Sequence, residues 1–399
     1  MNNDRREFLK KSAITTVGAF FLPQFLQAYS PLNLDGNNRR LVIIQLSGGN
    51  DSLNTVIPYN NSLYYEHRPT LAIAEQKVLK LNKQLGLHYS LSFFQDLLDK
   101  GEMNIINQVG YPNPNRSHFR SMDIWHTANI SSASSSEGWL GKYLDEFQGN
   151  TNKNIYSHQA IDLSGGSILA LQGQKRSGFG INSGKLIRGT NDHFLQQIQH
   201  HQEHTNSQVD YLYQVLANTY SSSEYILEKM KTKHSHQEYP SDNLGKQLKQ
   251  TADLITAGCN TEIYYLKVSG FDTHNSQLPR QERLLKQLNH GIQSFVKDLR
   301  RSGLWNSTRV MIFSEFGRRV KENGSKGTDH GAAGSLFLLG GKLKSSGIYN
   351  ASIDLENLEK GDVQYKIDFR RVYAELLDNW LEFPSNTILG ETFKSMNIV

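Results

Sequence analysis

Short apolar runs recur along the chain, and each is followed by a polar turn that contains glycine. The clearest runs span residues 41–46, 103–109, 263–268 and 309–313. Each has the length and the β-branched or aromatic content of a mostly buried strand bounded by a turn. Strands buried on both faces require helices on both sides of a sheet.

Stretches with a helical period lie between these runs. In residues 280–301, Leu284, Leu288, Ile292, Phe295 and Leu299 recur at helical spacing and are expected to face the sheet. The other helical stretches span residues 91–100, 118–126, 194–231, 244–257 and 369–381. Alternating strands and helices of this length predict an α/β fold with a doubly wound, mostly parallel sheet flanked by helices.

Polar residues follow the predicted strands at the edge where such sheets bind ligands. These residues are Asp51, Ser117, Asp272, His274 and Glu315. Asp329 and His330 precede a further apolar run and are placed to reach the same edge. Carboxylates and imidazoles gathered in one place require a cation among them, and both are ligands for hard and borderline metals. The sequence therefore predicts a metal site with one or more ions.

Each of these residues also has a simpler interpretation. Asp51 is suited to capping a following helix, and Asp272 and His274 are suited to turn hydrogen bonds. Glu315 and Arg318 would then be a helix-start carboxylate and half of a surface pair. These interpretations are independent of one another, whereas one metal site explains the residues through a single location.

The N-terminus has the layout of a twin-arginine export signal. Arg5 and Arg6 precede a Phe-Leu pair, and a mildly apolar stretch covers residues 12–28. The stretch is too polar for a stable membrane span, which needs about 20 strongly apolar residues. We therefore expect a signal peptide over residues 1–28, an exported periplasmic or cell-surface protein, and the twin-arginine export machinery as a partner.

Composition narrows the class of the remaining residues, 29–399. The net charge of +5 falls to about +3 without residues 1–28, which is too small a surplus to predict nucleic-acid binding. The single cysteine, Cys259, excludes an intramolecular disulfide framework. We expect a single large α/β domain with an insertion over residues 170–232, which carries no recognisable signature.

Several motifs resemble those of the family known as domain of unknown function 1501, in the same order along nearly the whole mature chain. They lie at residues 41–58 (LVIIQLSGGNDSLNTVIP), 116–125 (RSHFRSMDIW), 138–141 (GWLG), 270–274 (GFDTH), 314–318 (SEFGR) and 327–334 (GTDHGAAG). That family is similar in fold to the alkaline phosphatase and sulfatase group. The resemblance implies an alkaline-phosphatase-like α/β domain with its site at the strand ends.

The same resemblance implies roles for individual residues. Asp51 matches an aspartate that binds a metal in the phosphatase-like group, and Ser117 matches the place of the Ser or Thr nucleophile. A hydroxyl at a helix N-terminus beside a divalent cation would have its alkoxide stabilised by both. The alternative role of Ser117 is an N-cap. The neighbours Arg116, His118 and Arg120 are candidates for contact with an anionic substrate, and Arg318 is a fourth.

The proposed metal ligands depart from the group's pattern in two places. Asp272 and His274 match an Asp and a His of the first metal, but one residue separates them instead of three. Glu315 stands where the group has Asp followed by His, and here Phe316 follows, which puts a second metal in doubt. His330 matches the late histidine of the metal shell, with Asp329 as an additional candidate. The sequence after Ser117 lacks the formylglycine pattern of ordinary sulfatases.

Two weaker features remain. His200 and His204 have the i, i+4 spacing of a metal pair, but the glutamines around them favour a solvated helix face, and residues 131–136 form a serine-rich loop. The turn after residue 46 lacks the lysine of a P-loop and the dinucleotide fingerprint.

Two classes of function follow from these observations. The first is a metal-dependent hydrolase or transferase that acts on a phosphate or sulfate ester, small or polymeric, with a serine nucleophile and zinc, calcium, magnesium or manganese as the ion. The second is a non-catalytic exported binding or scaffold protein with a degenerate metal site. The loss at Phe316 favours the second, and the retention of Ser117 favours the first.

Overall fold

A computed structural model describes residues 39–130, 135–149, 157–181, 207–232, 235 and 237–399. All of them belong to one compact unit that starts at Asn37. The expected export signal and the histidines at 200 and 204 lie outside the described residues. Among the described helices, none combines the length and the hydropathy needed to cross a membrane.

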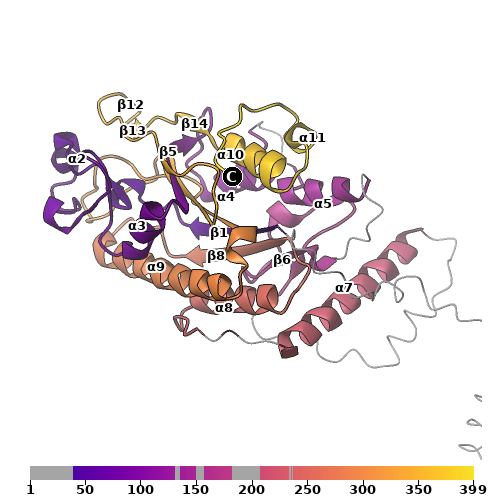
Figure 1. Cartoon of the computed structure of the whole chain (residues 1–399). Coiled ribbons are helices and arrows are strands. Elements are labelled where there is room, and N and C mark those ends of the chain that lie inside the picture. Colours follow the sequence, from indigo (N-terminus) through magenta and orange to yellow (C-terminus); the bar gives the residue numbers. More distant parts are fainter. Residues whose placement is uncertain (1–38, 131–134, 150–156, 182–206, 233–234, 236) are drawn as a thin grey trace, which may run out of the picture. The chain divides into compact units, whose positions relative to one another are not determined.

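A nine-stranded sheet forms the centre of this unit, and Figure 1 shows helices packed around it. Its main path runs β11-β5-β10-β9-β1-β8-β6-β7, and β14 pairs with β5 as well. The strands are β1 (Arg40–Ser47), β5 (Met103–Gly110), β6 (Ala160–Asp162), β7 (Phe179–Gly180), β8 (Ile263–Ser269), β9 (Thr308–Phe313), β10 (Gly334–Gly340), β11 (Gly347–Tyr349) and β14 (Ile367–Asp368). All pairings are parallel except those of β10 with β5 and β9. The predicted mostly parallel sheet is confirmed.

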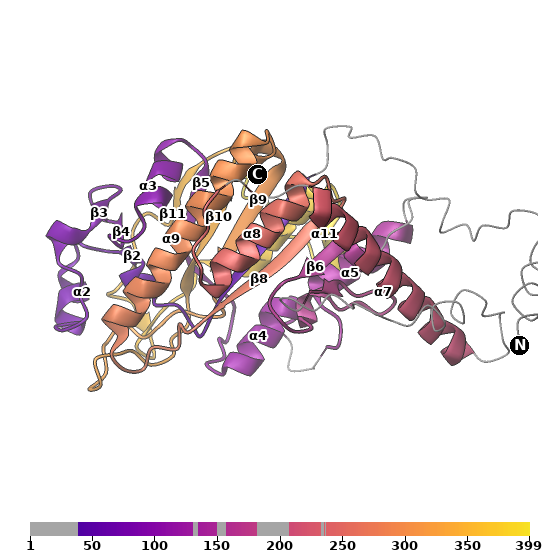
Figure 2. The ribbon, with the colours of Figure 1, turned by 90° about the horizontal axis from the view of Figure 1, so that it is seen from below.

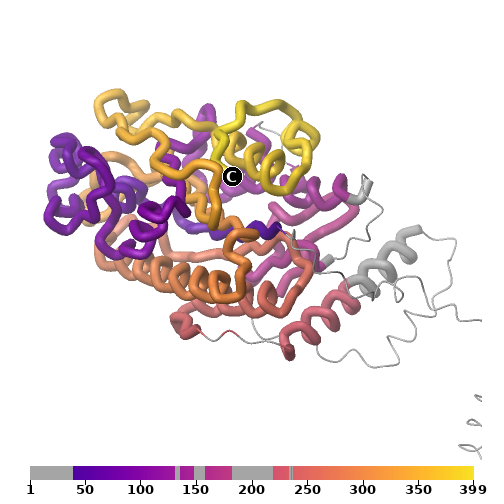
Figure 3. The backbone as a smooth tube through the Cα atoms, viewed as in Figure 1, coloured from indigo at the N-terminus to yellow at the C-terminus, as the bar shows by residue number. Residues whose placement is uncertain are grey.

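β1 lies in the middle of the sheet, and every residue from Arg40 to Leu46 is therefore buried. Figure 3 shows it as an indigo segment among parts of the chain that come more than 200 residues later. Leu41 and Ile43 point into one hydrophobic cluster, and Val42 and Ile44 point into the other. This strict alternation confirms that both faces of the sheet are covered.

Helices cover the two faces separately, as Figure 2 shows for the side with α3, α8 and α9. On α9, the leucines and aromatic residues expected to face the sheet are all buried. The opposite face carries α4, α5, α10 and α11. The helices are α2 (Ser62–His67), α3 (Ser92–Asp99), α4 (His118–Thr127), α5 (Trp139–Gly149), α7 (Ser207–Thr232), α8 (Asn243–Thr256), α9 (Gln277–Arg301), α10 (Phe369–Glu375), continued by a π-helical turn (Leu376–Trp380), and α11 (Ser385–Leu389).

Two small sheets and several single turns complete the unit. β2 (Val56–Ile57), β4 (Gly86–Leu87) and β3 (Leu79–Lys80) form one sheet, and β12 (Leu358–Glu359) and β13 (Asp362–Val363) form the other. The 3-10 turns are η1 (Ser52–Asn54), η2 (Glu75–Lys77), η3 (Ser157–Gln159), η4 (Leu169–Leu171) and η5 (Trp305–Ser307). β7 lies inside the range 170–232 that the sequence suggested as an insertion, and it pairs with β6 in the main sheet.

The loops that carry the candidate residues meet at one edge of the sheet. β1, β8 and β9 are parallel, so their carboxyl ends lie together. β10 is antiparallel to β9, and its start therefore reaches the same edge. Gly48 has a φ of +120°, and a Cβ there would stand 2.3 Å from the backbone nitrogen of Asp272. Glycine therefore lets the loops after β1 and β8 touch.

Candidate functional site

Three histidines surround the carboxylate of Asp272, whose side chain is 48% exposed. The Nε2 atoms of His274 and His330 lie 3.1 and 3.3 Å from its Oδ1. The Nε2 atom of His118 lies 3.6 Å from its Oδ2. The histidines come from the loop after β8, the segment before β10 and the first residue of α4, so the tertiary structure brings together residues more than 200 positions apart.

Each of the three imidazoles has its other nitrogen held by an oxygen. Nδ1 of His118 lies 2.8 Å from Oε1 of Glu315, and Nδ1 of His274 lies 3.0 Å from Oδ1 of Asp329. Nδ1 of His330 lies 2.7 Å from the carbonyl oxygen of Arg116, which can only accept. Hydrogen bonds of this kind place the proton on Nδ1 and leave the Nε2 lone pair facing Asp272.

Two observations indicate that the Nε2 atoms need a proton or a metal cation among them. Nε2 of His118 is buried and makes no hydrogen bond with the described residues. Nε2 of His274 and Nε2 of His330 lie 2.9 Å apart, although both rings donate from Nδ1. Two lone pairs at that distance repel unless a proton or a metal cation lies between them. Ligand atoms of His118, Asp272 and His330 all lie within 4.8 Å of one another, close enough to bind one ion.

The charges around the cluster favour an ionised Asp272. Burial opposes its ionisation, but the hydrogen bond and charge of Arg318 outweigh this effect and lower the pKa of Asp272 to about 2. The hydrogen bond to His274 lowers the pKa of Asp329. The hydrogen bond to Glu315 raises the pKa of His118, and partial burial lowers the pKa of His330. The acceptors that orient the histidines are the carboxylates of Glu315 and Asp329 and the carbonyl oxygen of Arg116.

Glu315 lies behind His118 and not beside Asp272. Its side chain is 1% exposed, and it also accepts hydrogen bonds from the backbone nitrogen of Gly48 and the hydroxyl of Ser314. Asp329 has the same relation to His274. Both were predicted as metal ligands, and the structure places both one layer further out, where they orient histidines.

Asp51 departs furthest from its predicted role as a metal ligand. Its carboxylate is fully buried and forms a two-point ion pair with Arg68, with N–O distances of 2.6 and 3.0 Å. It also accepts hydrogen bonds from Gln277 and from the backbone nitrogen of Leu53, so it caps η1. Four donors saturate the two oxygens, and the internal guanidinium supplies the charge expected from a metal. The capping interpretation is confirmed for this residue.

Arg318 was predicted to contact substrate. Its side chain is instead buried and links the loops through hydrogen bonds. Its side chain is 0% exposed, and it donates to the carbonyl oxygens of Gly48, Gly49, Phe271 and Thr328 as well as to Asp272. Because its side chain is 0% exposed, it has no place on the surface from which to contact a substrate. The prediction was wrong because the sequence does not show that several loop carbonyls converge on this position.

Ser117 occupies the N-cap position of α4 but makes no capping hydrogen bond with its side chain. It is exposed, and its backbone nitrogen bonds the side chain of Asn115. Arg116 and His118 on either side both contact the histidine cluster, so Ser117 is fixed between two residues of the site. Arg120 follows one turn along the helix and is half-buried.

A cavity of about 530 Å³ opens beside the cluster and is lined by His274, Asp329 and His330 together with Arg116, Arg319 and Lys321. Asp362, 3% exposed, holds two of these cations. Its Oδ2 accepts from Nε and Nη2 of Arg116, and its Oδ1 lies 4.0 Å from Nε of Arg319. Arg116 is therefore oriented by a buried carboxylate, Arg319 lies at ion-pair distance from the same group, and both line a space large enough for a small anion.

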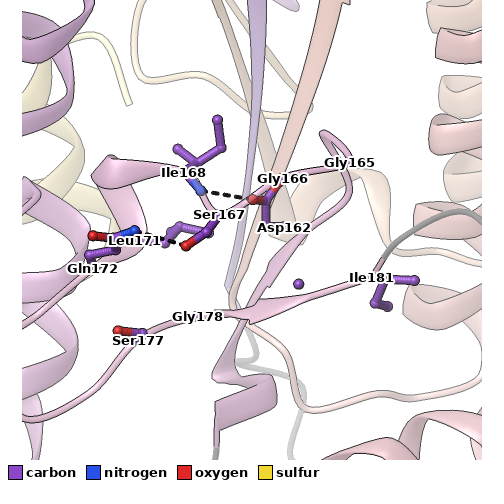
Figure 4. Close-up of a pocket in the computed structure, with 11 residues that line it drawn as sticks. Asp162, Gly165, Gly166, Ser167, Ile168, Leu171, Gln172, Ser177, Gly178 and Ile181 are labelled. Carbon is purple, nitrogen blue, oxygen red and sulfur yellow. Dashed lines mark hydrogen bonds between the residues drawn. The ribbon is translucent and has the colours of Figure 1, made fainter. Parts of the chain in front are cut away.

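A separate pocket of about 230 Å³ lies at the end of β6 and contains none of the predicted residues (Figure 4). Asp162 is its one carboxylate, and it accepts from the backbone nitrogens of Ser164 and Ile168. Both oxygens are used to hold the glycine-containing loop.

Three residues of the site have no clear signal in the sequence. Arg68 and Asp362 lie in segments without a motif, and their importance depends on partners at Asp51 and Arg116. Arg319 follows Arg318 directly, yet only the structure shows which of the two faces the cavity. His118 was predicted, but as a substrate contact; its place after Ser117 in the motif at 116–125 was the available signal.

Solved structures similar to the chain at low identity include three bacterial proteins. The PsFucS1 sulfatase from Pseudoalteromonas sp. is 11% identical over 91% of this chain and 71% of its own, with a TM-score of 0.40. The lipoteichoic acid synthase LtaP from Listeria monocytogenes is 11% identical over 78% and 68%, with a TM-score of 0.37. The periplasmic domain of EcEptC from Escherichia coli, in complex with Zn, is 11% identical over 90% and 92%, with a TM-score of 0.36.

These TM-scores are too low to transfer a residue role or an activity, and no curated protein sequence matches the chain. A family model does match, over residues 100–380, which is well over half of the chain. That range covers the motifs at 116–125, 138–141, 270–274, 314–318 and 327–334. The chain belongs to the family described as protein of unknown function (DUF1501).

Proposed function

We propose that this protein is an exported, metal-dependent hydrolase or transferase that acts on phosphate or sulfate esters, with Ser117 as its nucleophile. The observation that carries the proposal is the convergence of three imidazole Nε2 atoms on the carboxylate of Asp272, each imidazole being fixed through Nδ1. This arrangement is costly unless a proton or a metal cation lies between the Nε2 atoms of His274 and His330, which are 2.9 Å apart.

The donor set favours a borderline divalent metal, with zinc first among the candidates. Imidazole nitrogens and one carboxylate are typical ligands of zinc, whereas calcium and magnesium prefer oxygen. We assign His118, Asp272 and His330 as ligands, with His274 as a fourth candidate. Glu315 and Asp329 orient the histidines that they contact, as carboxylates behind metal-bound histidines commonly do.

Ser117 is the nucleophile candidate because its hydroxyl is exposed, makes no capping bond and stands between two residues of the cluster. A bound divalent metal would act as a Lewis acid and lower the pKa of a hydroxyl near it. In the proposed reaction Ser117 Oγ bonds to phosphorus or sulfur, its proton passes to solvent, and the ester oxygen leaves and takes up a proton as the alcohol. Water or a second alcohol then takes the group from Ser117.

The cavity beside the cluster supports an anionic substrate. Three cations, Arg116, Arg319 and Lys321, line it against the two carboxylates of Glu322 and Asp329, which leaves a surplus of positive charge. Planar guanidinium groups bind tetrahedral oxyanions through paired donors. We assign Arg116 and Arg319 to the anion, and Arg120 remains a candidate for the same role.

Export through the twin-arginine pathway is part of the proposal and rests on Arg5 and Arg6. Replacing both arginines by lysine should retain the protein in the cytoplasm, as measured by fractionation of cells that produce the full chain. Export that continues unchanged would exclude this route.

One observation favours the alternative, a binding or scaffold protein with a degenerate site. Asp51, which the family resemblance assigns to a metal, is neutralised by Arg68. The decisive experiment is metal analysis of the purified protein followed by assays with phosphate and sulfate mono- and diesters. Asp272→Asn should lower both the metal content and the activity, and Ser117→Ala should abolish turnover with the metal content unchanged. Metal-loaded protein that is inert on every ester would favour the binding class, and turnover by Ser117→Ala would exclude the covalent route.

A further inference from the structure

A second cavity, of about 370 Å³, lies next to the one at the histidine cluster. Arg116 lines both cavities, and its ion-pair partner Asp362 lines the second one. The walls of the second cavity come from the loop after β5, the residues before β10 and the segment from β12 to β14. Figure 1 shows β12, β13 and β14 close to β5.

The lining of the second cavity includes an aromatic ring that is partly exposed to solvent. Tyr365 is 38% exposed, and the only other large hydrophobic side chain that is exposed among the described residues is Phe119. The segment around Tyr365 is pinned to β5, because the nitrogen of Lys366 donates to the carbonyl of Gln108 and Nε2 of Gln108 donates to the carbonyl of Gln364. The ring therefore stands on a fixed backbone.

Side-chain amides around this ring keep unused hydrogen-bonding groups. Asn115 uses its Oδ1 to accept from Ser117, while its Nδ2 makes no hydrogen bond with any described residue. Gln364 uses its Nε2 to donate to Asn357, while its Oε1 accepts nothing from the described part of the chain. The cavity thus offers at least one amide donor and one amide acceptor that the fold does not need.

The charges of the cavity are balanced. Lys360 and Glu359 line it together, and Arg116 is paired with Asp362. A second anion would find no surplus of positive charge here, and an acyl chain would meet too many polar groups. An exposed aromatic face combined with free donors and acceptors suits a polyhydroxylated ring, whose C–H face packs on an aromatic and whose hydroxyls both donate and accept.

We infer that this second cavity binds the sugar part of the substrate, so that the ester cleaved at the histidine cluster is a phosphate or sulfate ester of a carbohydrate. The inference rests on the proposed function for its anionic half, and on Tyr365, Asn115 and Gln364 for its carbohydrate half. Because Arg116 borders both cavities, one ester spans them with its anionic group at the cluster and its ring against Tyr365.

The kinetic test compares esters that carry the same anionic group but differ in the size of their alcohol part. Hexose 6-phosphate and hexose 6-sulfate extend into the second cavity, whereas methyl phosphate and methyl sulfate are too small. Tyr365→Ala should raise KM for the hexose esters about tenfold, the size expected of one aromatic contact, and leave KM for the methyl esters unchanged. Gln364→Ala should act in the same direction. Phe119→Ala is the control, since this 87% exposed ring does not line the cavity.

A binding measurement separates failure of this inference from failure of the proposed function. Saturation-transfer NMR with neutral mono- and disaccharides should show contact with the wild-type full chain and with Phe119→Ala, and the contact should be lost in Tyr365→Ala. Sugar binding without any ester turnover would keep the sugar cavity and remove the hydrolase. Ester turnover that Tyr365→Ala changes equally for hexose and methyl esters, or a clear preference for nucleoside monophosphates, would overturn the sugar cavity.

Discussion

Two aspartates at the ends of the neighbouring strands β1 and β8 have opposite surroundings. Asp51 has a side chain that is 0% exposed, and Arg68 neutralises it within the fold. Asp272 is 48% exposed, and three histidines turn nitrogen atoms towards it. A buried carboxylate that is saturated by its own protein contributes to structure, whereas one that is open and surrounded by unsatisfied donor atoms is suited to a ligand.

The arginines show the same contrast between buried and exposed side chains. Two of them pair with these aspartates, and two others line the cavity at the histidine cluster. Arg68 and Arg318 are fully buried, and their hydrogen bonds go to the protein. Arg116 and Arg319 are more than a third exposed and line the cavity at the cluster. The structure therefore uses one set of cations to hold its loops and presents the other set to solvent.

The strongest test of this contrast removes the carboxylate of Asp51. Asp51→Ala leaves the buried charge of Arg68 without a partner, which should lower the free energy of unfolding by about 3–5 kcal/mol. Asp272→Ala removes the carboxylate that pairs with buried Arg318, but four carbonyl oxygens still accept from that guanidinium, so the loss should be smaller, about 1.5–3 kcal/mol. Urea denaturation followed by tryptophan fluorescence measures both. In the double variant Asp51→Leu with Arg68→Met, much of the loss should be recovered; a double variant as unstable as Asp51→Ala would show that the unpaired charge is not the cause.

The two histidines of α4 should respond oppositely to acid. His118 begins the helix beside Glu315, which raises its pKa, whereas burial lowers the pKa of His126 to about 4. The unfolded chain binds a proton at His126 near pH 6.5 and the folded chain does not, so stability is present above pH 6.5 and is lost as the pH falls towards 4. The loss should be about 3 kcal/mol, from 1.36 kcal/mol per pKa unit.

The measurement is the difference in unfolding free energy between the wild type and His126→Gln across pH 4 to 7. The difference removes the contributions of His88 and His158, whose pKa values burial also lowers to about 4. A difference that does not change with pH would mean that His126 accepts a proton in the folded protein.

Behind the open cluster, Glu315→Gln tests whether the outer carboxylate orients a metal ligand. Glutamine still accepts from Gly48 but no longer presents a charge to Nδ1 of His118. Zinc affinity should fall about ten- to a hundredfold, measured by competition with a chromophoric chelator. Glu375→Gln is the matched control, because this equally buried carboxylate binds the C-terminal segment far along the chain. Equal effects of the two variants would point to general loosening of the fold.

The smallest expected effect on stability comes from two N-cap residues, of which only one makes a capping hydrogen bond with its side chain. Ser117 stands at the start of α4 without a side-chain capping bond, whereas Asp242 accepts from the nitrogen of Gly245 at the start of α8. Ser117→Ala should therefore change the free energy of unfolding by less than about 0.5 kcal/mol, and Asp242→Ala should cost about 1 kcal/mol. Thermal unfolding resolves the two. A loss of 1 kcal/mol or more in Ser117→Ala would restore the capping role.

Much of the fold could be predicted because its strands are local features. The runs at 41–46, 103–109, 263–268 and 309–313 each became a strand within a residue or two of the expected limits. The antiparallel direction of β10 could not be predicted, because strand direction depends on the path of the chain between elements. α9 begins at Gln277, three residues before the first residue of the expected periodic stretch.

The candidate site could be located but not assigned in detail. Asp272, His274 and His330 lie together as expected, since strand ends meet at one edge of the sheet. Asp51 also follows a strand of that edge, but its choice of partner was decided by Arg68, 17 residues away in a segment without a motif. The position of a residue at a strand end predicts the region in which its side chain lies, but it does not predict which residue the side chain pairs with.

The sequence by itself determined the α/β class, the edge that bears the site and the family, because apolar runs, turn residues and motifs are readable along the chain. Only the tertiary structure decided that His118 joins Asp272 and His330, that Glu315 and Asp329 lie behind histidines, and that Arg318 is a tie between loops. The physical reason is that burial and charge pairing depend on distances in space, and a side chain's partner is set by the packing of segments that the sequence keeps far apart.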